Sequence, residues 1–307
     1  MTLEIVYTAG NDDLARVFVA RTADGSPIEF VESIQPPYSR EEKWVLIVST
    51  LKGCPVGCPI CDAGGDYRGT LTSDEILAQV EYLVHRRYRD GRCPVPKLKV
   101  QFARMGDPAL NDHMLNVLRE LPGRLDLPGL LPCFSTVAPF GRDDFMEELA
   151  QIKHELYGSG RFQMQFSIHS TDEAARRKLI PIKTWDLKKM ASFGDRFFEE
   201  GDRKITLNFA PAVGFELDPQ VLAPLFSPQR FTVKLTPINP TFASQRNDLT
   251  GLIDPADEDL NRSIAERFEQ LGYDTILSIG ELDENEIGSN CGMYVTRMEQ
   301  RPAAANE

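Results

Sequence analysis

Apolar and polar positions follow one pattern near the N-terminus and a different pattern in the rest of the chain. Near the N-terminus, Ala15–Ala20 and Ile28–Ile34 alternate between apolar and polar residues, and Asp24-Gly25 lies between them. An Asp-Gly pair between two alternating segments is a strong signal for a β-hairpin. The pattern therefore predicts a small antiparallel β unit over residues 1–40, which Pro36-Pro37 ends.

From Trp44 onward, short apolar segments alternate with stretches of helical periodicity. The predicted strands are 44–49, 97–102, 130–135, 162–167, 204–210, 231–236 and 274–278. The predicted helices are 73–88, 110–121, 142–156, 186–200, 217–225 and 256–271. Such alternation is typical of a parallel sheet with crossover helices, which places the chain in the α/β class. The number of strand–helix units favours an open or partial barrel, because a full eight-unit barrel needs a longer chain.

Charge and hydropathy narrow the range of partners. Acidic residues outnumber basic ones by 46 to 34, the net charge is −12, and we find no basic run or tail. Proteins that bind extended nucleic acid gain much of their affinity from Lys and Arg, so this composition disfavours such a partner. No apolar stretch approaches the ~20 residues that span a membrane. Because the N-terminal residues also lack the features of a signal peptide, we expect a cytoplasmic protein with reduced thiols.

Three of the six cysteines lie within one short loop. Cys54, Cys58 and Cys61 have the spacing C-x3-C-x2-C, directly after the predicted strand 44–49. In a reducing compartment this clustering indicates a metal site rather than disulfides. Thiolates suit iron–sulfur clusters and zinc, and three ligands would leave one iron of a [4Fe–4S] cluster open. A structural zinc site is the alternative, but it usually needs a fourth ligand from a paired motif, and the remaining cysteines form none.

Polar residues follow several of the predicted strands. In a parallel sheet the carboxyl ends of the strands meet at one edge, where the active site lies. Residues far apart in sequence are therefore expected at one rim. Singly, each has an ordinary structural explanation, as a turn or a helix cap. These residues are Cys54, Gly106-Asp107-Pro108, Ser135, His169 and Asn239.

The cysteine motif in this position resembles that of the radical S-adenosylmethionine (SAM) superfamily. The resemblance implies a partial (β/α)6 barrel over residues 41–298, with a C-terminal active-site segment. The tail at 299–307 is expected to be flexible, as chain ends often are. It also implies a [4Fe–4S] cluster held by Cys54, Cys58 and Cys61, and reductive cleavage of SAM to methionine and a 5′-deoxyadenosyl radical. The protein would then position and shield the radical, and an electron donor such as flavodoxin or ferredoxin would be a partner.

Further segments resemble the RlmN/Cfr-type ribosomal RNA adenine methyltransferases, in the same order from about residue 16 to 294. These segments are Met105-Gly-Asp-Pro108, Phe134-Ser-Thr136, Ser167-Ile-His169, Leu235-Thr-Pro-Ile-Asn-Pro240 and Asn290-Cys-Gly-Met293. Asp107 stands where the family has glutamate. The resemblance implies a SAM site formed by Gly106, Asp107, Ser135, Ser167, His169 and Asn239.

The resemblance also implies two catalytic residues. Cys291 corresponds to the cysteine that carries a methyl group, and Glu29 resembles the family's base. A second family cysteine is expected seven residues before Cys54, but the chain has Ile47 there. Isoleucine is neither a nucleophile nor a base, so the family mechanism cannot run unchanged. Cys93 and Cys133 are candidate replacements, and Cys133 is the nearer because it lies beside Ser135.

The substrate is expected to differ from that of the family. One family subgroup has an N-terminal RNA-binding domain, whereas this chain begins almost directly with the β unit and is acidic. Together with Ile47, this favours a small molecule, a nucleotide or a peptide over ribosomal RNA. Three alternatives stay open. They are radical hydrogen abstraction without methylation, an RNA adenine methyltransferase with a relocated thiol, and a non-catalytic iron–sulfur or zinc scaffold.

Overall fold

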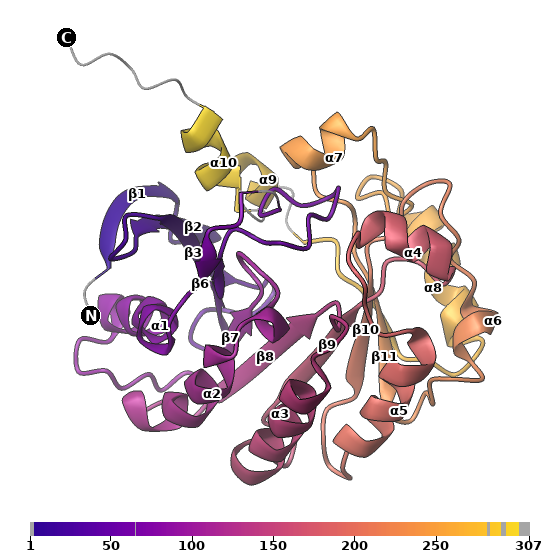
Figure 1. Cartoon of the computed structure of the whole chain (residues 1–307), viewed down its shortest axis with the longest axis horizontal. Coiled ribbons are helices and arrows are strands. Elements are labelled where there is room, and N and C mark those ends of the chain that lie inside the picture. The colour runs from indigo at the N-terminus through magenta and orange to yellow at the C-terminus, as the bar shows by residue number, and fades with distance from the viewer. Residues whose placement is uncertain (1–2, 65, 281–282, 290–292, 301–307) are drawn as a thin grey trace.

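The computed structural model describes residues 3–64, 66–280, 283–289 and 293–300 (Figure 1). Within these residues, one mixed sheet has the strand order β1-β2-β3-β4-β7-β8-β9-β10-β11-β12. In this order, each strand from β4 to β11 is parallel to the strand that follows it, so the α/β class with a mostly parallel sheet is confirmed. The parallel strands are β4 Trp44–Val48, β7 Leu98–Phe102, β8 Leu130–Thr136, β9 Gln163–Ser167, β10 Ile205–Phe209, β11 Phe231–Leu235 and β12 Thr275–Leu277.

The predicted N-terminal hairpin is present. β2 (Ala15–Arg21) pairs antiparallel with β3 (Pro27–Ile34), and β1 (Glu4–Gly10) adds a third strand. β3 also pairs antiparallel with β4. The β unit therefore continues the main sheet.

Helices cover the outer face of the parallel strands. Figure 1 shows them along the convex side of the curved sheet. In the first of these helices, Ile76, Val80 and Leu83 are buried at helical spacing, which gives it an apolar stripe toward the core. The helix begins at a capping box of Thr72 and Glu75. These outer helices are α1 Ser73–Arg87, α2 His113–Arg124, α3 Asp143–Leu156 and α5 Leu187–Phe197.

Several helix boundaries differ from the prediction. α2 begins later because Asp107 caps a separate 3-10 turn at Pro108–Leu110. α6 is only Pro219–Leu222, because Pro224 has no backbone N–H with which to continue the helical hydrogen bonds. α8 (Glu258–Glu269) lies inside its predicted range. Four short helices were not predicted from the sequence, namely α4 Glu173–Leu179, α7 Phe242–Arg246, α9 Asp283–Ile287 and α10 Met293–Gln300.

The inner face of the sheet is polar, in contrast to the outer face. Paired residues on neighbouring parallel strands point to the same face, so the register defines layers across the sheet. One layer runs through Ile47, Gln101, Cys133 and Gln163. Another runs through Ser167, Asn208, Lys234 and Ile276. The alternate residues Leu98, Val100 and Phe102 are fully buried in the apolar core on the helix side.

Within the described part of the chain, no helix is both long enough and apolar enough to cross a membrane. The predicted tail from Glu299 falls mostly on residues 301–307, which lie outside the described residues.

Candidate active site

One cavity of about 480 Å³ lies at the carboxyl ends of the parallel strands. It brings together the loop cysteines and every residue that was predicted to contact SAM. Ile47, at the position of the expected family thiol, also lines it. The predicted residues in its lining are Cys54, Cys58, Cys61, Gly106, Asp107, Ser135, Ser167, His169 and Asn239.

The cysteine loop needs glycine to reach this position. Gly53 has a φ of +77°, and a Cβ atom there would lie 2.3 Å from the carbonyl oxygen of Asp66. Burial raises the pKa of Cys54 to about 11, against hydrogen bonds from backbone amides that include those of Val56 and Asp107. Burial also raises the pKa of Cys58 to about 12. Buried thiols of this kind ionise readily only beside a positive centre, such as a metal that they ligate.

The donor set fits a cluster better than a single ion. In the described parts of the chain, no three His, Cys, Asp or Glu side chains converge on one metal position. A structural zinc requires its ligands within about 2.3 Å of one centre. In a [4Fe–4S] cluster each cysteine binds a different iron, so the thiols need to surround a larger group. Cys54, Cys58 and Cys61 all line one cavity, and none of them is in a disulfide.

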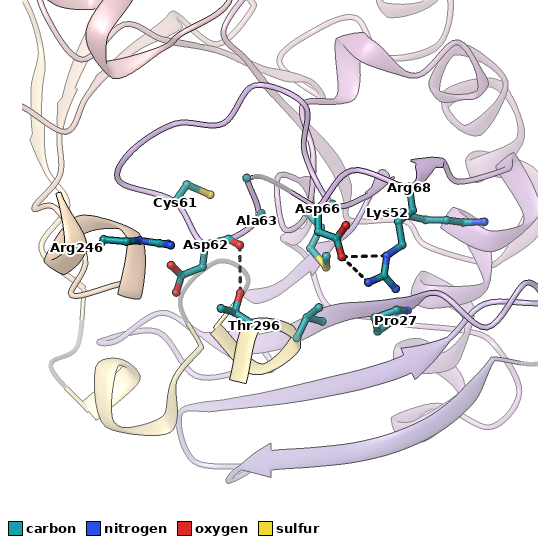
Figure 2. A pocket seen from close by; sticks show the side chains of 13 residues that line it. Pro27, Lys52, Cys61, Asp62, Ala63, Asp66, Arg68, Arg246 and Thr296 are labelled. Carbon is teal, nitrogen blue, oxygen red and sulfur yellow. Dashed lines mark hydrogen bonds and ion pairs between the residues drawn. The ribbon is translucent and has the colours of Figure 1, made fainter. Parts of the chain in front are cut away.

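Two C-terminal segments hold the cysteine loop in place. The Thr241 hydroxyl donates to the carbonyl of Ile60 at 3.0 Å, and the Asp62 carboxylate accepts from the backbone amide of Ala243 at 2.8 Å. The Thr296 hydroxyl of α10 donates to the carbonyl of Asp62 at 3.2 Å, as Figure 2 shows. The sequence analysis missed Asp62 and Thr241. The available signal was Thr241 itself, which is a favourable residue for a helix N-cap.

Asp107 is held rigidly beside the cysteine loop. Its carboxylate accepts hydrogen bonds from the amide of Val137 at 2.7 Å, the hydroxyl of Thr136 at 2.8 Å and the amide of Ala109 at 2.9 Å. Burial raises the pKa of Asp107 to about 6, against these bonds. Gly106, with a φ of +93°, brings the backbone so close to Leu51 that a Cβ atom would overlap its side chain.

His169 lies two residues after β9, which is the middle strand of the parallel part of the sheet. Its backbone has a φ of +65°, and its Nδ1 accepts from the amide of Ala210 at 3.1 Å. Burial, with a smaller effect from Arg176, lowers the pKa of His169 to about 4. The imidazole is therefore neutral near pH 7, with its proton on Nε2. In the described residues, Oδ1 of the neighbouring Asn208 is buried without a hydrogen-bond partner, and the sequence analysis missed this residue.

Glu29 occupies a different environment. Its side chain is fully buried on β3, and it is not among the residues that line the cavity. One carboxylate oxygen lies 2.6 Å from Nη2 of Arg104, and the other accepts from the amide of Val295 at 3.1 Å. Arg104 also donates to the carbonyl of Ser289. Cys291 lies outside the described residues, between these two contacts.

The two candidate replacement thiols differ sharply. Cys133 lines an adjoining cavity, at the register layer of Ile47. Its thiol donates to the carbonyl of Leu131 at 3.5 Å. Cys93 instead is fully buried in the apolar core. Of the two, only Cys133 faces a space that a substrate could enter.

Comparisons with known proteins agree with this geometry. No protein-family model matches the chain. A probable dual-specificity RNA methyltransferase RlmN from Desulfitobacterium hafniense is 26% identical over 294 residues, which cover 94% of the chain and 77% of that protein. A protein of the same name from Frankia alni is 29% identical over 293 residues, covering 92% of the chain and 65% of that protein.

Solved structures show the same fold. A radical SAM methyltransferase from Sphaerobacter thermophilus superposes with a TM-score of 0.74 at 23% identity, covering 95% of the chain and 81% of that structure. SuiB from Streptococcus suis, bound to S-adenosylmethionine, superposes with a TM-score of 0.51 at 13% identity. This second match covers 84% of the chain and 53% of SuiB. At these identities the structural likeness concerns the fold alone.

Proposed function

Because the chain belongs to the RlmN/Cfr-like group of radical SAM enzymes, we propose that it modifies an unactivated carbon of its substrate by methyl transfer through Cys291. Cys54, Cys58 and Cys61 would hold the [4Fe–4S] cluster. The observation that carries the proposal is the single cavity that all three cysteines share with the predicted SAM residues.

When bound, the [4Fe–4S] cluster would supply the electron for reductive cleavage of SAM. The protein's own residues orient SAM. The rigid Asp107 carboxylate has lone pairs to accept from the ammonium of the methionine part. Neutral His169 donates from Nε2, and Asn208 accepts through its unpartnered Oδ1. Ser135, Ser167 and Asn239 supply further polar contacts around the cavity.

Cys291 would accept the methyl group from SAM. Its thiolate attacks the methyl carbon of one SAM molecule, forming a new sulfur–carbon bond as the old one breaks and S-adenosylhomocysteine leaves. Glu29 is the candidate acid–base group by family resemblance. Its contacts with Arg104 and the Val295 amide also support a role in positioning the segment that carries Cys291.

We further propose a non-ribosomal substrate, namely a small molecule, a nucleotide or a peptide. The net charge of −12 and the apolar Ile47 at the cavity support this choice. A flavodoxin or ferredoxin would deliver the electron. An RNA adenine methyltransferase with a relocated thiol is the second candidate, because the curated relatives carry that activity in their names. Radical hydrogen abstraction without methylation is the third.

The test is the intact mass of the anaerobically reconstituted protein after incubation with SAM. We expect a gain of one CH2 unit that peptide mapping places on Cys291. Cys291→Ala should show no gain, and the core variant Cys93→Ala should behave as the wild type does. Formation of 5′-deoxyadenosine without methylated Cys291 would exclude the methyl relay. Label transfer from SAM to ribosomal RNA would favour the second candidate.

A further inference from the structure

A second cavity, of about 610 Å³, adjoins the first inside the curved sheet. The two cavities share lining residues, among them Ile47, Ser135, Gln165 and Lys234. The second cavity extends toward the amino ends of the strands, where its lining includes residues one or two positions before β4, β7 and β10. A molecule in it would therefore reach from the amino ends of the strands to the candidate SAM site.

The lining of this second cavity is strongly cationic. Lys99 and Lys234 come from the inner face of β7 and β11. Lys43, Lys97 and Arg203 precede β4, β7 and β10. This charge is unexpected in a chain whose net charge is −12.

Among the described residues, these cations have few compensating anions. Glu284 is the one carboxylate in the described lining of the cavity. In the described part of the chain, no carboxylate lies within ion-pair distance of Lys97, Lys99 or Lys234. Lys43 donates to the side chain of Gln35, which carries no charge.

These cations also destabilise one another's protonated forms. Burial and, to a smaller extent, repulsion from Lys99 lower the pKa of Lys234 to about 8. Burial likewise lowers the pKa of Lys43 to about 8, with added repulsion from Lys99 and Lys97. Enclosed like charges are unfavourable unless a counter-charge is present. A bound anion would supply that counter-charge and keep all of these amines protonated.

We infer that this cationic cavity binds the anionic group of a small polyanionic substrate, such as a phosphate ester or a polycarboxylate. The inference rests on the proposed function, and it narrows the substrate class. The anionic group would lie among Lys97, Lys99 and Lys234, and the rest of the substrate would extend past Cys133 toward the SAM site. The cations face the interior of the sheet, which fits a small anion that enters the cavity better than an RNA backbone on the surface.

Binding of inorganic pyrophosphate and of citrate tests this inference. Each is titrated into the anaerobically reconstituted enzyme at low ionic strength and followed by calorimetry. We expect saturable binding of at least one of them, weakened about tenfold in Lys99→Gln and in Lys234→Gln. Lys99→Arg should restore most of the affinity because it keeps the charge. Lys188→Gln removes an exposed lysine of α5 and should bind as the wild type does.

The two probes distinguish a phosphate-bearing substrate from a polycarboxylate by which binds more tightly. Thermal unfolding of each variant without probe shows that the substituted proteins remain folded. Failure of the wild type to bind either probe, or wild-type affinity in both cavity variants, would overturn the inference. Cleavage of SAM is measured on the same preparation. Enzyme that cleaves SAM but binds neither anion refutes only this inference, whereas enzyme that binds pyrophosphate but never cleaves SAM refutes only the proposed function.

Discussion

The carboxylate of Glu29 lies 2.6 Å from the guanidinium of Arg104, and both side chains are buried. Each residue also binds the backbone of the C-terminal segment, Glu29 at Val295 and Arg104 at Ser289. The ion pair therefore ties the start of the chain to both sides of the segment that contains Cys291.

Glu29→Gln should lower the free energy of unfolding by about 3 kcal/mol, because it leaves the buried guanidinium of Arg104 without its counter-charge. Urea unfolding measures this loss. Glu155→Gln changes an exposed glutamate of α3 and should have almost no effect. If the free energy of unfolding falls as little in Glu29→Gln as in Glu155→Gln, the Glu29–Arg104 ion pair does not stabilise the fold.

Asp107→Asn should weaken SAM binding about tenfold. The change removes the negative charge. It also places the NH2 group of the new side chain against one of the N–H or O–H donors from which the Asp107 carboxylate accepts a hydrogen bond. Equilibrium dialysis with labelled SAM gives the dissociation constants. Asp144→Asn, an exposed position on α3, is the matched control. Unchanged affinity in Asp107→Asn would remove Asp107 from the SAM site.

His169 should make stability depend on pH. Its pKa is about 4 in the folded protein, below the ordinary value of 6.5, so the unfolded chain binds more protons between these values. Stability from this group is thus complete above about pH 6.5 and is lost as the pH falls toward 4. Between pH 7.5 and 5 the loss should be about 2 kcal/mol.

Comparison with His169→Gln isolates this contribution, because Gln can still accept from the Ala210 amide but does not titrate. Asp107, whose raised pKa acts in the opposite direction, is present in both proteins and cancels. Urea unfolding should show that the free energy of unfolding falls less between pH 7.5 and 5 in His169→Gln than in the wild type. Parallel declines would mean that His169 is not buried in its neutral form.

Cys133 should react with a small neutral thiosulfonate much faster than Cys93 does. Cys133 lines the second cavity, whereas Cys93 is enclosed by the apolar core. Peptide mass mapping of the reconstituted enzyme follows both sites over time. Saturating pyrophosphate should slow the modification of Cys133. Equal rates at the two cysteines would contradict the assignment of Cys133 to the cavity.

The residues of the SAM cavity could be predicted because each follows a strand or belongs to a short motif. Parallel topology then brings Cys54, Asp107 and His169 to one rim without further information. The helices with long apolar stripes were predicted for a similar reason. The short helix α7 was missed, since five residues carry too little periodicity.

The cationic cavity and the Glu29–Arg104 pair could not be predicted. Lys99 and Lys234 each appear as one polar residue within an apolar strand, and nothing local indicates that they face the same space. Their relationship depends on sheet register, which pairs residues far apart in sequence. Glu29 and Arg104 likewise meet only after β3, β4 and β7 pair.

The central claim is that the three loop cysteines hold a cluster that cleaves SAM. The most direct test is to incubate the anaerobically reconstituted protein with SAM and dithionite and to measure 5′-deoxyadenosine. We predict its formation by the wild type and its loss in Cys58→Ala, with Cys93→Ala retaining activity. A colourless wild-type protein that holds zinc and releases no 5′-deoxyadenosine would contradict the account.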